Sequence, residues 1–236
     1  MVGIEVDRRT FLKATAVGAA SLLVPGDLGY AATASKVIWS LPTSKTQRFA
    51  WTVDDGVSSR AVTDYLKFSS RYDLKFTFFV TSCYQTWQEN KAGIAAGLAS
   101  GRIQLGNHSH THKNWTHLTE KLIRQDLMGC HNRMLDMFGY DMRPYFRPPY
   151  GLYNDQVLAV AAAEGYTKPM MWNGSLADSG STNEKALIRN AKTWIGSGRI
   201  VIDHANSTFT ADHFSDVLNV VRSRGLSTVT LREVFG

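Results

Sequence analysis

The sequence is poor in the features that mark several protein classes. It has only two cysteines and none precedes Cys83, so we expect no lipid-anchored cysteine near the N-terminus. Its N-terminal apolar stretch, 14–24, is shorter than the roughly 20 residues that a bilayer span needs. Lysine and arginine are scattered, without a basic run interleaved with aromatic residues, which argues against a nucleic-acid-binding surface. Residues 47–236 contain no repeat, low-complexity tract or Pro/Ser-rich linker, so no second domain is expected.

The chain does have enough apolar sequence for one folded domain. Its 236 residues are 44% hydrophobic, which is sufficient to bury a substantial core within one α/β domain. The formal net charge of +6 favours an acidic polymer or a cell surface as a neighbour. We expect a monomer without a stable membrane anchor.

The first 34 residues have the pattern of a targeting segment. Residues 8–13 read Arg-Arg-Thr-Phe-Leu-Lys, which matches the twin-arginine consensus, although Asp7 replaces the usual Ser or Thr. Ala32-Thr33-Ala34 is a small-x-small cleavage site. We therefore expect export through the twin-arginine translocase to the periplasm, cell wall or exterior. The alternative is an N-terminal helix with chance arginines. The expected parts are a signal peptide over 1–34, a short leader over 35–46 and a catalytic domain over 47–236.

The rest of the chain alternates β-rich runs with helical stretches, a pattern typical of a parallel sheet covered by helices. Seven strands are expected, at 48–53, 76–81, 103–107, 145–147, 167–172, 200–203 and 227–230. Helices are expected near 58–70, 89–100, 119–138, 154–164, 183–195 and 211–224, with Thr119 as a capping residue. Polar residues follow several strand ends, where (β/α) barrels place active sites. We therefore predict a distorted seven-stranded (β/α) barrel in preference to an open doubly wound sheet.

Two clusters in these loops have the residue types of a metal site. Asp54 and Asp55 end the first strand and can hold different partners, although an ordinary Asp-Asp-Gly turn is the alternative. His108 and His112 are four residues apart, which places both imidazoles on one face if the loop turns helically. With Asp55 they would form a His₂Asp site with open positions. His110 should point away.

Together with an arginine motif at 147–151 and a histidine motif at 202–204, these residues resemble the polysaccharide deacetylases of carbohydrate esterase family 4. The resemblance covers nearly all of 47–236. The family's Thr-Phe-Asp-Asp-Gly is Thr-Val-Asp-Asp-Gly at 52–56, and its His-Ser/Thr-x-x-His is 108–112. Its Arg-x-Pro-Tyr-Gly is unchanged at 147–151, and its aliphatic-x-His is 202–204. The fourth motif, Asp-x-x-Asp-Trp, departs: it is Ser-Leu-Ala-Asp-Ser at 175–179, which removes one sugar-stacking wall.

The resemblance implies a role for each matching residue. It implies that Asp55, His108 and His112 hold one divalent metal. Zinc is the metal expected from the resemblance, although cobalt, nickel or manganese suit the same ligands. Asp54 is the general base. The remaining roles are orientation of Asp54 by a bidentate pair with Arg147, an oxyanion donor at the Tyr150 N–H, and a general acid at His204 paired with Asp178.

Aromatic residues near these motifs are candidates for stacking on sugar rings. We expect Trp115, Trp172 and Tyr150 to bind substrate, with Trp115 as the first choice because it lies in a polar loop just after His112. Trp87 and Tyr153 are weaker candidates.

The two cysteines are expected to remain free. Cys130 lies on the apolar stripe of its helix and should face the sheet, while Cys83 follows the second strand at a different depth. A bridge between them is the alternative, since export permits disulfides.

The resemblance thus implies a metal-dependent hydrolase that removes acetyl groups from N-acetylated amino-sugar glycans of the peptidoglycan or chitin type. An O-acetyl esterase acting on xylan is the alternative within the same chemistry. A catalytically silent carbohydrate-binding module is the alternative from another class, which the presence of both Asp54 and His204 argues against.

Overall fold

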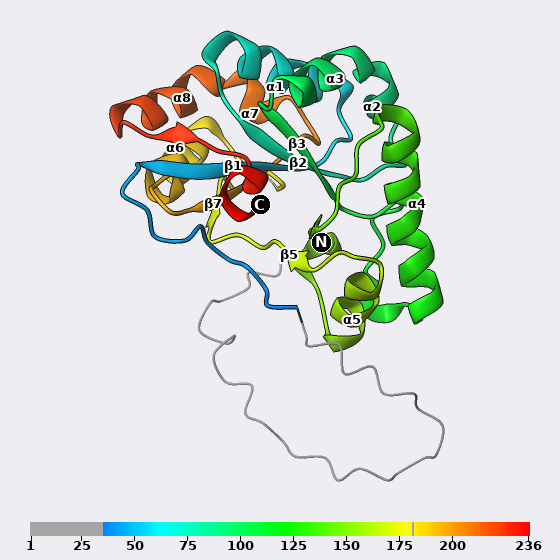
Figure 1. Ribbon diagram of the computed structural model, residues 1–236. Coiled ribbons are helices and arrows are strands. Elements are labelled where there is room, and N and C mark those ends of the chain that lie inside the picture. Colours follow the sequence, from blue (N-terminus) through cyan, green and yellow to red (C-terminus); the bar gives the residue numbers. More distant parts are fainter. Residues whose placement is uncertain (1–34, 181) are drawn as a thin grey trace, which may run out of the picture. The chain divides into compact units, whose positions relative to one another are not determined.

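The computed structural model describes residues 35–180 and 182–236 (Figure 1). The expected signal peptide, 1–34, lies outside the described residues. Within the described ranges, no helix is long and apolar enough to cross a membrane.

Strands and helices alternate along the chain as expected. The strands are β1 (Arg48–Asp55), β2 (Phe76–Val80), β3 (Ile103–Asn107), β4 (Tyr145–Phe146), β5 (Lys168–Pro169), β6 (Gly174–Ser175), β7 (Ile200–His204) and β8 (Ser227–Thr228). The helices are α1 (Ser59–Tyr72), α2 (Thr86–Glu89), α3 (Lys91–Ala99), α4 (Glu120–Phe138), α5 (Asp155–Ala163), α6 (Glu184–Trp194), α7 (Phe209–Asp212), α8 (Phe214–Ser223) and α9 (Leu231–Phe235). Two short 3₁₀ turns complete the list, η2 (Trp115–His117) and η3 (Pro149–Gly151).

The sheet is parallel and curls into a half-barrel. Its strand order is β5-β4-β3-β2-β1-β7-β6, and β8 pairs beside this path with the start of β1. The predicted (β/α) barrel is therefore confirmed. The expected seventh strand, 227–230, is the two-residue β8, and the seventh position of the path is taken by β6, which the sequence did not indicate. Two residues are too few to show an alternating pattern.

Residues 35–46, expected to be a leader, contribute to the fold. Ile38 forms a parallel bridge with Met170, just after β5, and Ser40 forms an antiparallel bridge with Arg199, just before β7. Leu41 is buried with the residues that fill the barrel interior. This segment therefore connects the β5 and β7 sides of the half-barrel.

Successive side chains of β1 point to opposite faces of the sheet and so contribute to two separate apolar clusters, one under the helices and one inside the barrel. Trp51 faces outward, where its ring stacks on Phe214 of α8 with centroids 5.5 Å apart. Ala50 faces the interior with Phe79 and Ile200, in a second cluster that fills the barrel below the polar residues. In Figure 1 the helices lie along the outer side of the strands. The polar ends of the strands are thus supported from both sides by apolar packing.

Local signals set the helix ends that flank the site. Ser58 caps α1, because its Oγ accepts a hydrogen bond from the Ala61 N–H at 3.2 Å. Thr119 occupies the expected cap position of α4, but its side chain makes no capping hydrogen bond. Gly139 ends α4 with φ of 62°, in the left-handed region.

Candidate active site

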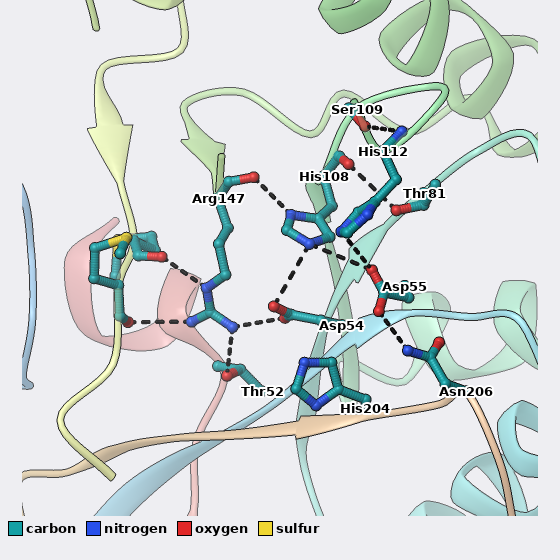
Figure 2. Close-up of polar contacts among 12 residues, drawn as sticks. Thr52, Asp54, Asp55, Thr81, His108, Ser109, His112, Arg147, His204 and Asn206 are labelled. Atoms are coloured by element: carbon teal, nitrogen blue, oxygen red, sulfur yellow. Dashed lines mark hydrogen bonds and ion pairs between the residues drawn. The ribbon is translucent and has the colours of Figure 1, made fainter. Parts of the chain in front are cut away.

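A pocket of about 450 Å³ opens where β1, β3 and β7 end. The strand register aligns these ends, since Asp54 on β1 pairs with His204 on β7 and Asp55 pairs with Val80 on β2. The lining residues come from all of the expected motifs: Asp54, Asp55, His108, His112, Tyr150, Gly151, Trp172, Ser175, Ser179, Ile202, His204 and Asn206. Figure 2 shows the polar contacts among the central ones.

The two adjacent aspartates both reach this pocket, although neighbours on an extended strand point to opposite faces. Asp55 has φ of 71°, which turns its side chain back toward the site. Gly56 follows with φ of 90° and lies against Trp87, where an added Cβ would come within 2.2 Å of the indole ring. The backbone conformation at Asp55 and Gly56 therefore directs both carboxylates into the pocket, which an ordinary Asp-Asp-Gly turn would not do.

The two histidines converge by a different route from the one expected. Residues 108–112 form no helix; Ser109 and His112 instead have positive φ angles of 79° and 57°. Side chains hold this turn, because Asn107 Oδ1 accepts from the Ser109 N–H at 2.9 Å and Ser109 Oγ accepts from the His112 N–H at 2.8 Å. The prediction that both rings share one site is confirmed, but the helical explanation was wrong.

Asp55, His108 and His112 fit a divalent cation. Asp55 Oδ1 lies 3.1 Å from His112 Nε2 and 3.4 Å from His108 Nε2, and it is a buried oxygen without a hydrogen-bond partner in the described part of the chain. His108 Nδ1 contacts the Arg147 carbonyl at 2.7 Å, and as the donor it leaves the Nε2 lone pair directed at Asp55. Three ligand atoms thus face one point, and a cation would satisfy the orphaned oxygen.

The electrostatics of these ligands suit a metal. Burial acts to raise the pKa of Asp55, but the close contact with His112, the positive charge that either histidine carries when protonated, and a hydrogen bond from Asn206 hold that pKa well below its usual range. Burial lowers the pKa of His108, so its ring is neutral at physiological pH. An ionised carboxylate and a neutral imidazole are the forms that bind a metal.

Asp54 has a separate partner in Arg147, which is fully buried. Arg147 Nη1 donates to Asp54 Oδ1 at 2.6 Å and to Thr52 Oγ1 at 2.9 Å. Its Nε and Nη2 donate to the carbonyls of Met170 and Met171 at 2.8 and 3.1 Å. The expected bidentate pair with Asp54 is therefore wrong: one nitrogen contacts the carboxylate, while the backbone fixes the rest of the guanidinium.

His204 and Asp178 form a second polar pair beside the pocket. His204 Nδ1 lies 3.0 Å from Asp178 Oδ1, and the His204 backbone N–H donates to Asp178 Oδ2 at 2.8 Å. Burial acts to lower the pKa of His204, but the hydrogen bond and charge of Asp178, with the charge of Asp54, raise it to about 9. The imidazole therefore carries a proton at neutral pH.

Tyr150 lies at the pocket mouth. It has φ of 60°, and its ring centroid is 4.5 Å from that of His112. Within the described residues its N–H has no hydrogen-bond acceptor, while the flanking Gly151 N–H donates to the Pro148 carbonyl. Tyr150 is 61% exposed, so its ring is open to a ligand.

Of the aromatic residues expected to bind sugar, some line the pocket and others are buried in the core. Trp172 lines the pocket and packs over the Arg147 guanidinium at 5.3 Å. Trp115, the first choice for stacking, is wrong: it is completely buried, and its indole N–H donates to Asp126 Oδ2 at 2.8 Å. Trp87 is equally buried beneath Gly56. The polar loop around Trp115 is covered by α4, which carries Asp126.

Asn206 was missed by the sequence reasoning. Its Nδ2 donates to Asp55 Oδ2 at 2.6 Å, on the oxygen that does not face the histidines. It fixes the rotation of this carboxylate, as outer-shell hydrogen bonds do for metal ligands. Its position two residues after His204 was the one available signal.

The altered fourth motif lines one wall of the pocket. Ser175 and Ser179 stand where the family pattern has aspartate and tryptophan, and both contribute to the lining. Ser175 Oγ is engaged locally, since it accepts from the Ala177 N–H at 3.0 Å.

The remaining motif residues lie elsewhere. His110 points away from the ligands, as expected, and its Nδ1 contacts Ser82 Oγ at 2.8 Å.

Both cysteines are free, which confirms that prediction. Cys130 is buried and faces the sheet, with Sγ 3.2 Å from the Val80 carbonyl, whereas Cys83 is exposed.

Comparison with known proteins agrees with this geometry. Residues 5–25 match the signal sequence of the twin-arginine translocation pathway, which confirms the export signal. The peptidoglycan-N-acetylglucosamine deacetylase PgdA of Listeria monocytogenes is 29% identical over 198 residues, covering 83% of this chain and 41% of that protein. The bifunctional xylanase/xylan deacetylase of Cellvibrio japonicus is 29% identical over 153 residues, covering 60% and 22%. The chain thus spans less than half the length of either relative.

A solved structure shows the same fold. A carbohydrate esterase family 4 pseudoenzyme from Bacillus anthracis superimposes with a TM-score of 0.74 at 20% identity, covering 86% of this chain and 69% of that chain. The family model for polysaccharide deacetylases matches residues 42–169. Because this match spans more than half of the sequence and contains the aspartate, histidine and arginine motifs, the chain belongs to the polysaccharide deacetylase family.

Proposed function

We propose that this exported protein is a metal-dependent deacetylase that hydrolyses N-acetyl groups on amino-sugar glycans of the peptidoglycan or chitin type. One observation carries the proposal: the orphaned Oδ1 of Asp55 faces both Nε2 atoms of His108 and His112, in a pocket that also holds Asp54 and His204. A binding site for glycan alone requires neither a cation site nor two groups able to move protons.

A divalent cation, zinc or else cobalt, nickel or manganese, would be held by Asp55, His108 and His112. When bound, it would polarise the acetyl carbonyl and acidify a water molecule. All other steps belong to side chains of the chain itself.

Asp54 is the proposed general base, which takes the proton from the attacking water. Arg147 holds Asp54 Oδ1 at 2.6 Å, and backbone carbonyls fix the guanidinium in turn, so the second carboxylate oxygen keeps a constant direction. Asp54 Oδ2 lies 3.7 Å from His108 Nε2, which directs that oxygen toward the cation site.

His204 is the proposed general acid, which protonates the departing amine. Asp178 orients its ring and raises its pKa to about 9, so that the proton is present at neutral pH. The base on β1 and the acid on β7 therefore flank the place where an acetyl group would lie.

The Tyr150 N–H is the proposed donor to the developing oxyanion, because its left-handed backbone leaves it without a partner among the described residues. The rings of Tyr150 and Trp172 are the proposed contacts for sugar faces. The two serines that replace the fourth-motif aspartate and tryptophan make the opposite wall smaller, which favours a bulky or substituted sugar there.

Two alternatives remain open to test. Xylan O-acetyl ester hydrolysis uses the same groups, and the similarity to the Cellvibrio xylanase/xylan deacetylase favours it as the second candidate. A silent carbohydrate-binding module is the third. We further propose that the signal peptide ends at residue 34 and that the catalytic domain, expected to begin at residue 47, also includes 35–46, because this segment forms bridges to residues beside β5 and β7.

The deciding experiment measures acetate release from chitooligosaccharide, peptidoglycan and acetylxylan. The enzyme is tested after chelation and again after titration with Zn²⁺, Co²⁺, Ni²⁺ or Mn²⁺. His112→Ala should abolish metal-dependent release, and His117→Ala, an exposed histidine outside the pocket, is the matched control. Release from acetylxylan alone would favour the esterase. Glycan binding without acetate release under any metal would favour the binding module and overturn the proposal.

A further inference from the structure

Asp203 is a buried carboxyl group that the proposed reaction does not use. It lies on β7 between Ile202 and His204, both of which line the pocket. Strand alternation turns the Asp203 side chain the other way, into the layer between the sheet and the helices, where it is completely buried. A carboxyl group in such a place needs partners for every oxygen.

Four donors meet this carboxyl group, three from other parts of the fold and one from β7 itself. Its Oδ2 accepts from the Tyr65 hydroxyl of α1 and from the Trp51 indole N–H of β1, the latter at 3.1 Å. Its Oδ1 accepts from Thr210 Oγ1 of α7 at 2.9 Å and from the His204 backbone N–H at 3.1 Å. Asp203 therefore ties the end of β7 to β1, α1 and α7.

The second carboxyl group at this point is Asp178. The His204 N–H is shared between Asp203 Oδ1 at 3.1 Å and Asp178 Oδ2 at 2.8 Å, so the two carboxyl groups meet at one donor. Asp178 also holds the His204 ring. If both carboxyl groups were ionised, two negative charges would face one imidazolium in a buried space, which leaves one charge uncompensated.

We propose that Asp203 is protonated and donates a hydrogen bond from Oδ1 to Asp178 Oδ2, which makes it a positioning residue for the Asp178–His204 pair. The part of this inference that concerns catalysis rests on the proposed function. The proton assignment does not, because it concerns the resting protein.

The surroundings of Asp203 support this protonation state. Burial and the nearby charge of Asp178 raise the pKa of Asp203 well above its usual range, and they outweigh the hydrogen bonds from Tyr65 and Thr210, which act to lower it. The titratable groups that face it are Tyr65 from α1, Asp178 from the loop after β6 and His204 from β7. Trp51 and Thr210 are uncharged donors. Burial also raises the pKa of Tyr65 well above its usual range, so Tyr65 remains a neutral donor.

A neutral Asp203 has two effects on His204. The hydrogen bond to Oδ2 fixes the rotation of Asp178, so that Oδ1 stays aimed at the imidazole. The imidazolium also faces one anion, and not two, on the Asp178 side of its ring. A second anion would hold the proton on His204 more firmly and weaken it as an acid.

Asp203→Asn tests the assignment, because an amide is a neutral isostere of the protonated acid. Its nitrogen can donate to Asp178 Oδ2, while its oxygen accepts from Tyr65 and Trp51. Asp203→Ala removes the contact, and Asp212→Asn is the matched control, since Asp212 is exposed and its carboxylate accepts from Thr208 Oγ1. Infrared spectroscopy of the resting wild type detects a protonated carboxyl group by its C=O stretch.

We expect that band in the wild type and in Asp212→Asn, and its loss in Asp203→Asn. Asp203→Asn should keep kcat within about threefold and leave the alkaline limb of the pH profile in place, whereas Asp203→Ala should lose about 10–100-fold in kcat with KM little changed. Absence of the band from the wild type, or an alkaline limb moved to lower pH in Asp203→Asn, would overturn the proposal.

The proton assignment can be tested even if Asp203→Ala does not fold or the wild type is inactive. If Asp203→Ala does not fold, the wild-type spectrum and the Asn variant still decide the proton assignment. If the wild type releases no acetate from any glycan, the proposed function fails, but the infrared comparison remains a complete test of Asp203.

Discussion

Asp54 and His204 are paired neighbours on the adjacent parallel strands β1 and β7. The register that aligns them places a carboxylate held by Arg147 opposite an imidazole held by Asp178. Two groups suited to opposite proton transfers are therefore fixed by the sheet itself, and the loops need only close the pocket around them.

Asp54→Asn should keep the metal and lose activity, because Asp55 and not Asp54 completes the cation site. Loss of a general base is expected to lower kcat by about 10²–10⁴-fold. Metal content by elemental analysis and acetate release are measured together. Asp55→Asn, the adjacent control, should have a lower metal content than Asp54→Asn. Reduced metal content in Asp54→Asn with activity retained would mean that the two roles are reversed.

His204→Ala should affect amides more than activated aryl acetates. An amine must be protonated as it departs, whereas a stabilised phenolate leaves without a proton. The ratio of kcat/KM for the two substrate types is the measurement, and we expect it to fall by at least about tenfold. Equal losses on both substrates would remove His204 from the role of acid.

The pH profile should report the same histidine. Because the pKa of His204 is raised from 6.5 to about 9, the acid form is present below that value, and amide hydrolysis should decline as pH rises through it. Asp178→Asn removes the main cause of the increase, so the alkaline limb should move to lower pH. A limb that stays in place in this variant would show that another group titrates there.

Asn206→Ala should weaken metal binding by about 10–100-fold, since Asn206 fixes the Asp55 carboxylate. Competition with a chelator measures the affinity. Asn132→Ala, on the exposed face of α4, is the matched control. The prediction is wrong if both variants bind metal as the wild type does.

Gly56→Ala should destabilise the fold more than Gly101→Ala. Both glycines have positive φ, 90° and 71°, but an added Cβ meets Trp87 at 2.2 Å in the first case and nothing within 4 Å in the second. Gly101→Ala should cost about 1 kcal/mol of unfolding free energy for the backbone alone, and Gly56→Ala about 2–4 kcal/mol. Denaturant unfolding compares the two. Equal losses would show that the indole ring moves aside.

The sequence predicted the site better than it predicted the loops that form it. The candidate metal ligands were identified because Asp55, His108 and His112 are metal-binding residue types within motifs that resemble those of a known family. The positive φ angles that bring them together were not predictable, since Ser109 and His112 are not glycines.

Burial of single side chains was harder still to predict. Trp115 lies in a polar stretch of sequence, yet Asp126 on α4 accepts its indole N–H and completes its burial. Asn206 looks like an ordinary turn residue until its contact with Asp55 is known. Both errors have one cause: the deciding partner is distant in sequence, and local pattern carries no information about it.

The bridge at Ile38 has a consequence for maturation. The Ile38 N–H donates to the Pro169 carbonyl and its own carbonyl accepts from the Met171 N–H, so it holds the backbone whose Met170 and Met171 carbonyls bind Arg147. Cleavage after Ala34 would leave only residues 35–37 ahead of this bridge. A cut made slightly later would loosen the support of Arg147, and through it the orientation of Asp54. The signal peptidase would then determine catalytic competence as well as release of the mature protein.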